Sequence, residues 1–223
     1  IEQHGPEAVA LYVSGQLLTE DYYVANKLMK GALGTANIDT NSRLCMASSV
    51  AGHKRAFGGD VVPGNYADLD EAELVVLAGS NAAWTHPVWF QRLQAAREAE
   101  GGPQVMVIDP RRTATAEQAD RHLALAPGTD AVLWNGLLVH LVETGAVDQA
   151  FMRDHTRGFE AALAAARGAA PSPDAVARAC GLSRVAVEAF YTAFAGTEAV
   201  VSAYSQGVNQ AANGTDQVNA ILN

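Results

Sequence analysis

The sequence predicts an α/β fold: a three-layer parallel sheet with helices on both faces, plus part of a second α/β domain. Between residues 69 and 143, short apolar runs alternate with longer helical stretches, which is the order of βαβ units. Hydrophobic residues make up 49% and charged residues 17% of the 223 residues, a globular composition at a length that supports a core without disulfides or metals. Two further apolar runs lie outside the alternation, one near each end of the chain.

The first 66 residues are predicted to hold one strand and two helices. The run AVALYVS at residues 8–14 is short, apolar and β-branched, as in a buried strand. Acidic residues after Thr19 and a glycine at Gly34 mark the start and end of a helix. Residues 37–43 are predicted to be a polar connection. A second helix is expected from about residue 45 to residue 57, followed by a loop rich in Gly and Pro.

The middle of the chain has the regular alternation. Glycine and proline clusters separate its apolar runs, which gives the element boundaries. The predicted strands are residues 73–78, 104–108 and 122–125, and the predicted helices are residues 86–98, 114–119 and 130–143.

The last third is predicted to be helical, with one final strand. Ser172 before Pro173, and Ser183 before the next apolar stretch, are typical helix N-caps. The run EAVVSAYS at residues 198–205 is the predicted strand. Because this strand and the one near residue 10 both end beside Gly-Gln or Gln-Gly, we expect them to share an incomplete domain. That domain would comprise residues 1–45 and 198–223, and residues 46–197 would form a dinucleotide-binding-like α/β domain.

Charge and apolar run length exclude two classes of partner. Lys and Arg total 15 against 24 Asp and Glu, a net charge of −9. Nucleic acids and anionic membranes attract positive fields, so neither is expected as a partner. No apolar run approaches 18 residues, so no membrane insertion is expected. The two cysteines, 135 positions apart, do not form a disulfide framework.

Small and polar residues follow three of the predicted strands. They are Gly79-Ser80-Asn81, the segment 109–113 and Gly128-Thr129-Asp130. Ligands of open α/β sheets bind outside the carboxyl ends of the strands, so these loops indicate a nucleotide site, with Asp109 suited to a ribose hydroxyl. The sequence has neither GxGxxG nor a Walker lysine. Ordinary turns and a helix cap explain the same residues, and both interpretations stay open.

Two cysteines and one basic cluster are the remaining candidates for chemistry. Cys45 lies near a predicted helix start, where a thiolate is favoured and can bind a metal; a small buried side chain is the other interpretation. Cys180 is interpreted as structural. His53, beside Lys54 and Arg55, belongs either to a basic patch facing an anion or to a solvated helix end.

Several strings in this sequence resemble one family. The segment NIDTNSRLCMASSVAGHKRAFG resembles the surroundings of the metal-binding cysteine in molybdopterin oxidoreductases of the dimethyl sulfoxide reductase superfamily. The strings YVSGQLLTEDYYVANKLMKG, LAGSNAAWTHP, VIDPRRT, APGTD and YSQGVNQAANGT occur in the matching order. Within the superfamily, the chain is most similar to the catalytic subunits of bacterial assimilatory nitrate reductases, over essentially its whole length.

The resemblance implies a role for each candidate residue. Cys45 matches the thiolate that ligates molybdenum, as both catalytic and metal-binding residue. The other positions match contacts to a molybdenum-bis(molybdopterin guanine dinucleotide) cofactor. They are Gln16 and Asn41; Ala78, Gly79, Ser80 and Asn81 along one dinucleotide; Asp109, Pro110, Arg111, Arg112 and Thr113 with Gly128, Thr129 and Asp130 at its guanosine end; and Gln206 and Gln210 near the metal.

The implied reaction is oxygen-atom transfer that reduces nitrate to nitrite. Electrons would return through a [4Fe-4S] cluster from a reductase, ferredoxin or flavodoxin type of donor, and a cytoplasmic location is expected. The family's amino-terminal cluster-binding cysteines have no counterpart here, so we expect an internal fragment that is inactive alone. Met46 stands where formate dehydrogenases typically have histidine, which favours nitrate. Formate dehydrogenase, a dinucleotide-dependent dehydrogenase and a non-catalytic nucleotide-binding domain remain the alternatives.

Overall fold

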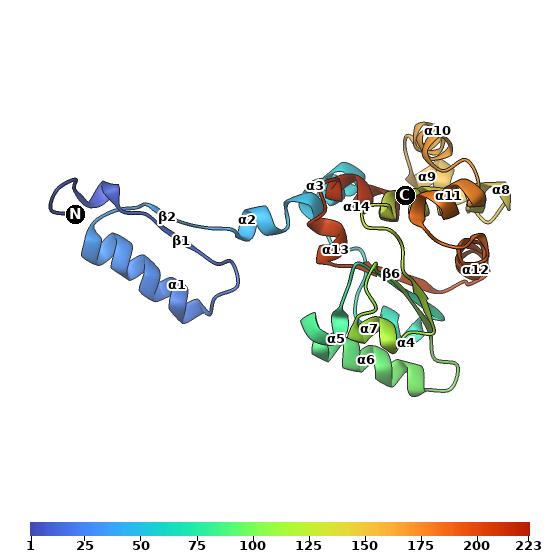
Figure 1. Ribbon diagram of the computed structural model, residues 1–223, viewed down its shortest axis with the longest axis horizontal. Helices are drawn as coiled ribbons and strands as arrows, with labels where there is room; N and C mark the ends of the chain where they lie inside the picture. The colour runs from blue at the N-terminus through green and yellow to red at the C-terminus, as the bar shows by residue number, and fades with distance from the viewer. The chain divides into compact units, whose positions relative to one another are not determined.

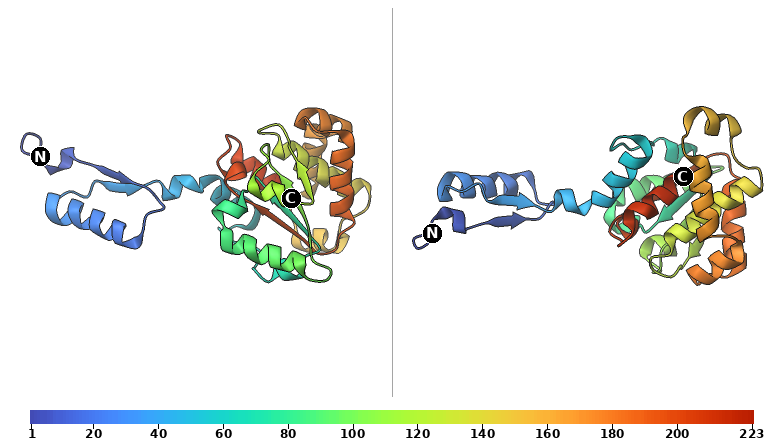
Figure 2. Two further views of the ribbon diagram at one scale, coloured as in Figure 1. Left: turned by 60° about the horizontal axis from the view of Figure 1, so that its bottom comes forward. Right: turned by 90° about the horizontal axis from the view of Figure 1, so that it is seen from above.

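The computed structural model describes residues 1–223, which divide into two compact units, Ile1–Ala47 and Ser48–Asn223. The first unit contains a two-stranded parallel sheet, and the second contains a four-stranded parallel sheet with helices around it (Figures 1 and 2). The predicted α/β class with parallel strands is therefore confirmed.

The first unit is a small strand–helix–strand arrangement. Its elements are η1 (Pro6–Ala8), β1 (Leu11–Val13), α1 (Thr19–Asn26), the π-helical turn η2 (Lys27–Leu33), β2 (Ile38–Thr40) and α2 (Ser42–Cys45). The helix ends as predicted at Gly34, whose φ of 76° is left-handed. Strand β2 lies within the predicted polar connection, so that prediction was wrong. Ile38-Asp39-Thr40 carries little strand signal of its own and becomes a strand because it pairs with the open edge of β1.

The four-stranded sheet of the second unit has the order β5-β4-β3-β6, and its strands are all parallel. The strands are β3 (Leu74–Ala78), β4 (Gln104–Ile108), β5 (Arg121–Leu123) and β6 (Val200–Tyr204). Every residue of β3 is buried, as expected for a central strand covered on both faces.

Helices cover both faces of this sheet, which makes the three predicted layers (Figure 2). One face packs on α4 (Asp68–Glu71), α5 (Ala82–Thr85), α6 (Pro87–Glu98) and α7 (Ala114–Glu117). The other packs on α8 (Asp130–Glu143), α11 (Pro173–Cys180), α12 (Arg184–Ala195) and α14 (Gly214–Leu222). The remaining helices are α3 (Ala47–Phe57), α9 (Gln149–His155), α10 (Phe159–Ala169) and α13 (Gln206–Asn209).

Alternate residues of the strands supply the two cores. Val75 and Leu77 pack with Phe90 and Leu93 of α6. On the other face, Val76 and its neighbours pack with α8, α11 and α12. The predicted N-caps are confirmed. The Ser172 hydroxyl accepts a hydrogen bond from the Ala175 amide at 3.3 Å, and the Ser183 hydroxyl accepts one from the Ala186 amide at 3.1 Å.

The position of β6 corrects the predicted domain division. The sequence grouped residues 198–223 with residues 1–45, but β6 pairs in parallel with β3, from Leu74 opposite Val200 to Ala78 opposite Tyr204. Helix α14 joins the same core through Val218. The physical reason is that β3 has a second backbone edge to satisfy, and the β-branched residues of β6 suit a half-buried strand.

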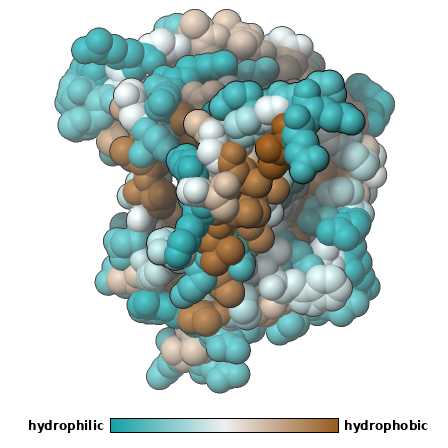
Figure 3. All heavy atoms as spheres, turned by 90° about the vertical axis from the view of Figure 1, so that its left-hand side faces the viewer, coloured by the Kyte–Doolittle hydropathy of each residue, from teal (hydrophilic) through white to brown (hydrophobic).

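Large apolar side chains are also exposed, and Figure 3 shows brown apolar atoms among polar ones on one face of the molecule. A two-stranded sheet with one helix buries little apolar surface, so several such side chains of the first unit remain at the surface. They include Tyr12, Leu18, Tyr23 and Val24. No helix in either unit combines the length and the apolar character needed to cross a bilayer.

Candidate functional site

The winding of the four-stranded sheet reverses between β3 and β6. Strands β3, β4 and β5 follow one another in one direction, and β6 returns to the far side of β3. Such a reversal leaves a crevice outside the carboxyl ends of the two strands, where ligands of open α/β sheets bind. The predicted loop Gly79-Ser80-Asn81 follows β3, and Gln206 follows β6, so the fold brings both to this point.

The loops after β3 and β6 are in backbone contact at the reversal. The amide of Gly207 donates to the carbonyl of Gly79 at 2.9 Å, and the amide of Ser205 donates to Ala78 at 3.2 Å. A Cβ atom on Gly79 would lie 2.8 Å from the Gly207 Cα, and the φ of Gly79 is 54°. Only glycine permits both the approach and the left-handed backbone. Gly207 was not among the predicted site residues, although the sequence analysis noted the Gln-Gly pair that follows this strand.

The loop after β4 is bonded to the loop after β3. The Thr115 hydroxyl donates to the Asn81 side-chain oxygen at 3.0 Å and accepts from the Ala83 amide at 2.9 Å. The Thr113 hydroxyl caps α7 by accepting from Ala116 at 3.2 Å. Thr115 was not predicted, and no local pattern distinguishes it from other helix residues.

Two buried carboxyl groups lie at the same edge of the sheet. Asp109 and Asp130 are only 6% and 7% exposed, and Asp109 accepts the Arg111 amide at 2.8 Å. Burial raises the pKa of Asp130; a backbone hydrogen bond opposes this effect, and the negative charge of Asp109 adds to it. Buried carboxylates of this kind are suited to accepting hydrogen bonds from N–H or O–H groups of a ligand.

The other predicted residues of this edge differ in exposure. Ser80 and Thr113 are buried, and Thr129 is half-buried. Pro110, Arg111, Arg112 and Gly128 are exposed, so both guanidinium groups can reach an anion in solvent. Gln206 is half-buried and Gln210 is exposed.

In the first unit, the segments that follow β1 and β2 hold the predicted residues Gln16, Asn41 and Cys45. The Asn41 side-chain oxygen accepts the Gly15 amide, and a Cβ on Gly15 would lie 2.6 Å from the Ser42 Oγ. The amide of Cys45 donates to the Asn41 carbonyl at 2.9 Å. The two loops are thus packed at the carboxyl ends of the parallel pair, with Gln16 exposed and Cys45 half-buried.

The surroundings of Cys45 differ slightly from the prediction. Cys45 is the last residue of α2, and α3 begins at Ala47, two residues later than expected. Cys180 is fully buried and its thiol faces the Thr129 carbonyl at 3.7 Å, as a structural residue would. Burial raises the pKa of the Cys180 thiol.

The predicted basic patch of His53, Lys54 and Arg55 does not form. His53 is only 9% exposed and bonds to Tyr204, whereas Arg55 pairs with Asp216 at the surface at 3.0 Å. The solvated-end interpretation of His53 was therefore wrong as well. Local charge misled the prediction because successive side chains of a helix point about 100° apart around its axis, so His53 faces inward while Lys54 and Arg55 face solvent.

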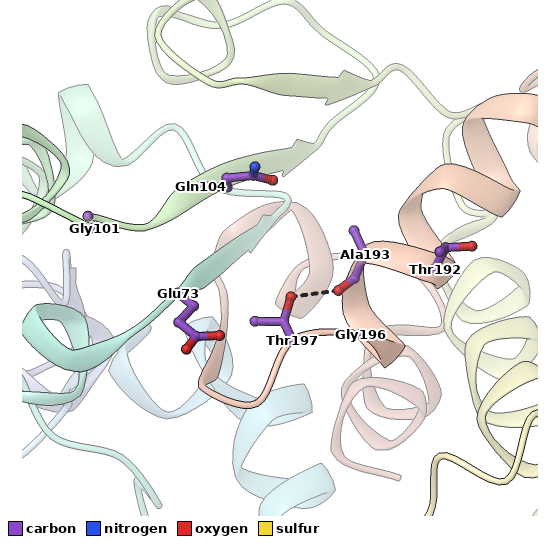
Figure 4. Close-up of a pocket in the computed structure, with 8 residues that line it drawn as sticks. Glu73, Gly101, Gln104, Thr192, Ala193, Gly196 and Thr197 are labelled. Carbon is purple, nitrogen blue, oxygen red and sulfur yellow. Dashed lines mark hydrogen bonds between the residues drawn. The ribbon is translucent and has the colours of Figure 1, made fainter.

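A cavity of about 410 Å³ lies at the opposite, amino-terminal end of the sheet (Figure 4). Glu73 directly precedes β3 and Gln104 begins β4, and both line it. Its other side is formed by Thr192, Ala193, Gly196 and Thr197 at the end of α12. None of the predicted site residues lines this cavity.

A parallel sheet with helices on both faces and a reversal of strand order defines a doubly wound α/β fold. Comparison with known proteins narrows the class. The family model described as Molybdopterin oxidoreductase matches residues 1–223. A nitrate reductase of Klebsiella oxytoca is 53% identical over 223 residues, which is all of this chain and 25% of that protein. A nitrate reductase of Shewanella frigidimarina is 52% identical over the same length, 24% of that protein.

One solved structure shows the same fold. Acetylene hydratase from Pelobacter acetylenicus superposes with a TM-score of 0.71 and 24% sequence identity, over 96% of this chain and 28% of that chain. The chain spans about a quarter of the length of the nitrate reductases it matches. It belongs to the molybdopterin oxidoreductase family, whose cofactor is a molybdenum-pterin.

The residues present fit such a group chemically. The first unit offers one half-buried thiol, Cys45, and thiolate is a ligand that softer metals accept. The second unit offers buried carboxylates, Asp109 and Asp130, for N–H and O–H donors, and exposed guanidinium groups for phosphate.

Proposed function

We propose that this chain is part of a molybdenum-dependent nitrate reductase that reduces nitrate to nitrite. The observation that carries the proposal is the identity of 52–53% to two nitrate reductases across all 223 residues. Met46 beside Cys45 supports nitrate over formate as the substrate.

The role of Cys45 follows from its place in the chain. Its backbone is fixed by the hydrogen bond to Asn41, at the end of a short helix and before α3. A thiolate held in this way would ligate the metal. When bound, the cofactor supplies the two-electron oxygen-atom transfer by which nitrate becomes nitrite.

The loops at the sheet edge are proposed to hold a molybdopterin guanine dinucleotide. Asp109 and Asp130 would accept hydrogen bonds from guanine N–H groups or ribose hydroxyls, and Arg111 and Arg112 would neutralise phosphate. The backbone of Gly79 to Asn81 would lie along the dinucleotide, with Gly128 and Thr129 at its guanosine end. Gln16, Asn41, Gln206 and Gln210 would contact the pterin groups.

Further parts of the electron path are proposed from the family resemblance. The cofactor would contain a second dinucleotide, in the bis form. Electrons would reach it through a [4Fe-4S] cluster from a donor of the reductase, ferredoxin or flavodoxin type. Resemblance to assimilatory enzymes supports a cytoplasmic location. The site residues on this chain would orient and ligate the cofactor, and the other steps need the complete enzyme.

The test uses the full-length protein. We expect stoichiometric molybdenum by elemental analysis and nitrate-dependent oxidation of a reduced viologen dye. Cys45→Ala should abolish turnover, whereas the matched variant Cys180→Ala should retain it, because Cys180 is packed in the core. Protein that contains no molybdenum, or a Cys45→Ala variant with wild-type turnover, would refute the proposal. Formate oxidation in place of nitrate reduction would assign the other activity of the family.

A further inference from the structure

A chain of hydrogen-bonded side chains runs through the interior of the second unit from α3 to α13. Its members are Ser49 on α3 and Asn209 and Gln206 on α13, and a separate hydrogen bond joins His53 on α3 to Tyr204 at the end of β6. Ser49, His53 and Asn209 are 7%, 9% and 2% exposed. Buried polar groups are costly unless they are bonded, so these side chains hold one another in defined orientations.

The separate hydrogen bond with His53 fixes Tyr204. The Nδ1 of His53 bonds to the Val61 carbonyl, which can only accept, so Nδ1 carries the proton. In a neutral imidazole the other nitrogen is then an acceptor, and the Tyr204 hydroxyl, 2.8 Å from Nε2, donates to it. The ring of Tyr204 is therefore held from α3.

The chain itself fixes the amide of Gln206. The Ser49 amide and hydroxyl both bond to the Asn209 Oδ1, at 2.9 and 2.7 Å. With its oxygen held in this way, Asn209 directs its Nδ2 to the Gln206 Oε1 at 2.7 Å. The oxygen of Gln206 thus faces Asn209, and its amide nitrogen is turned away from Asn209.

The chain ends at the reversal point of the sheet. Gln206 directly precedes Gly207, whose backbone contacts Gly79. A small rotation of α13 would therefore move both the Gln206 amide and the loop that follows β3.

We propose that Ser49 and Asn209 are positioning residues that set the direction of the Gln206 amide toward the cofactor. This inference rests on the proposed function and adds residues that touch neither substrate nor cofactor. The hydrogen bond from Asn209 to Gln206 gives the most specific test. If an acceptor replaced the Asn209 Nδ2 donor, the Gln206 side chain should turn so that its nitrogen, and not its oxygen, faces residue 209.

Two variants of the full-length enzyme cut the chain at different links. Ser49→Ala removes the hydroxyl that donates to the Asn209 Oδ1. Asn209→Asp keeps an acceptor for Ser49 but replaces the Nδ2 donor by an oxygen, which would draw the nitrogen of Gln206. Tyr191→Phe is the matched control: its hydroxyl is also buried, donates to the Leu133 carbonyl at 2.7 Å, and lies in the core around α8 and α12.

The readouts are molybdenum content, the molybdenum(V) electron paramagnetic resonance spectrum, KM and kcat for nitrate, and the melting temperature. We expect Ser49→Ala and Asn209→Asp to shift the spectrum and to lower kcat/KM about tenfold, since a displacement of about 1 Å in a site can have an effect of this order or larger. All three variants should lose a few degrees of melting temperature, and Tyr191→Phe should keep the wild-type spectrum and kinetics.

Each other outcome overturns the inference. Unchanged spectra and kinetics in either chain variant with full molybdenum content would show that the amide is set by other contacts. Equal changes in Tyr191→Phe would show a general effect of lost stability. Either result leaves the proposed function standing, whereas wild-type protein without molybdenum overturns both. If Ser49→Ala fails to fold, Asn209→Asp decides the question alone.

Discussion

The contact between Gly79 and Gly207 should tolerate no side chain. A Cβ on Gly79 would come within 2.8 Å of both the Gly207 Cα and the Val208 nitrogen, which are backbone atoms that cannot rotate away. Gly79→Ala should therefore destabilise the second unit in two ways. It would place a side chain at a φ of 54°, and it would force the loops after β3 and β6 apart.

The two contributions can be estimated separately. A left-handed backbone at a non-glycine residue costs about 1–2 kcal/mol, and overpacking costs about 1–3 kcal/mol. Gly79→Ala should thus cost about 2–5 kcal/mol. Gly207→Ala, with a Cβ 2.7 Å from the Gly79 Cα but no positive φ, should cost about 1–3 kcal/mol. Gly145→Ala has a φ of 71° and open space around it, so only the conformational cost of about 1–2 kcal/mol applies.

Urea unfolding followed by far-ultraviolet circular dichroism measures all three free energies. A thermal scan should show a loss of about 3 °C for each kcal/mol in a unit of this size. Gly79→Ala should lower the free energy of unfolding more than either Gly207→Ala or Gly145→Ala does. If Gly79→Ala unfolded no more easily than Gly145→Ala, the two loops would not be in fixed contact and the reasoning would fail.

Two further predictions concern titratable groups. Under native conditions Cys45 should react with a thiol reagent well before Cys180. Cys180 is fully buried, and this burial also raises the pKa of its thiol. Mass spectrometry of the labelled peptides measures the order of reaction, and faster labelling of Cys180 would contradict the prediction. Because burial raises the folded-state pKa of Asp130 above 3.8, the folded state binds more protons than the unfolded chain, and stability falls as pH rises through the interval between the two values. Asp130→Asn should therefore stabilise the fold at neutral pH and gain nothing at strongly acidic pH, as urea midpoints measured across pH would show; an equal gain at both ends of the pH range would contradict the assignment.

The elements predicted well from the sequence are those with a strong local signal. The central strands β3 and β4 are continuous apolar runs because both of their faces are covered. Helix α8 begins and ends where its caps indicate, at Asp130 and Glu143. The pairing partner of β6 was beyond this reasoning, because pairing between distant segments leaves no mark within either one. Strand β2 and helices α13 and α14 were missed because their residues are largely polar.

The candidate site was predicted to a similar extent and for similar reasons. Loops such as Gly79-Ser80-Asn81 could be found because they follow recognisable strands, and parallel strands share one carboxyl edge. Thr115 and Asn209 could not be found, because their importance lies in partners far along the chain. His53 was misjudged because neighbouring charges say nothing about the direction of its own side chain.

The order of strands also affects how the protein is made. Strand β6 is about 125 residues after β3, so at about 5–20 residues per second the ribosome needs roughly 6–25 s to supply it. During that time one side of the most apolar strand in the sheet has no partner. An unpaired strand of this kind templates aggregation. Nascent chains stalled before residue 200 should therefore recruit chaperones, and release from them should follow emergence of Tyr204.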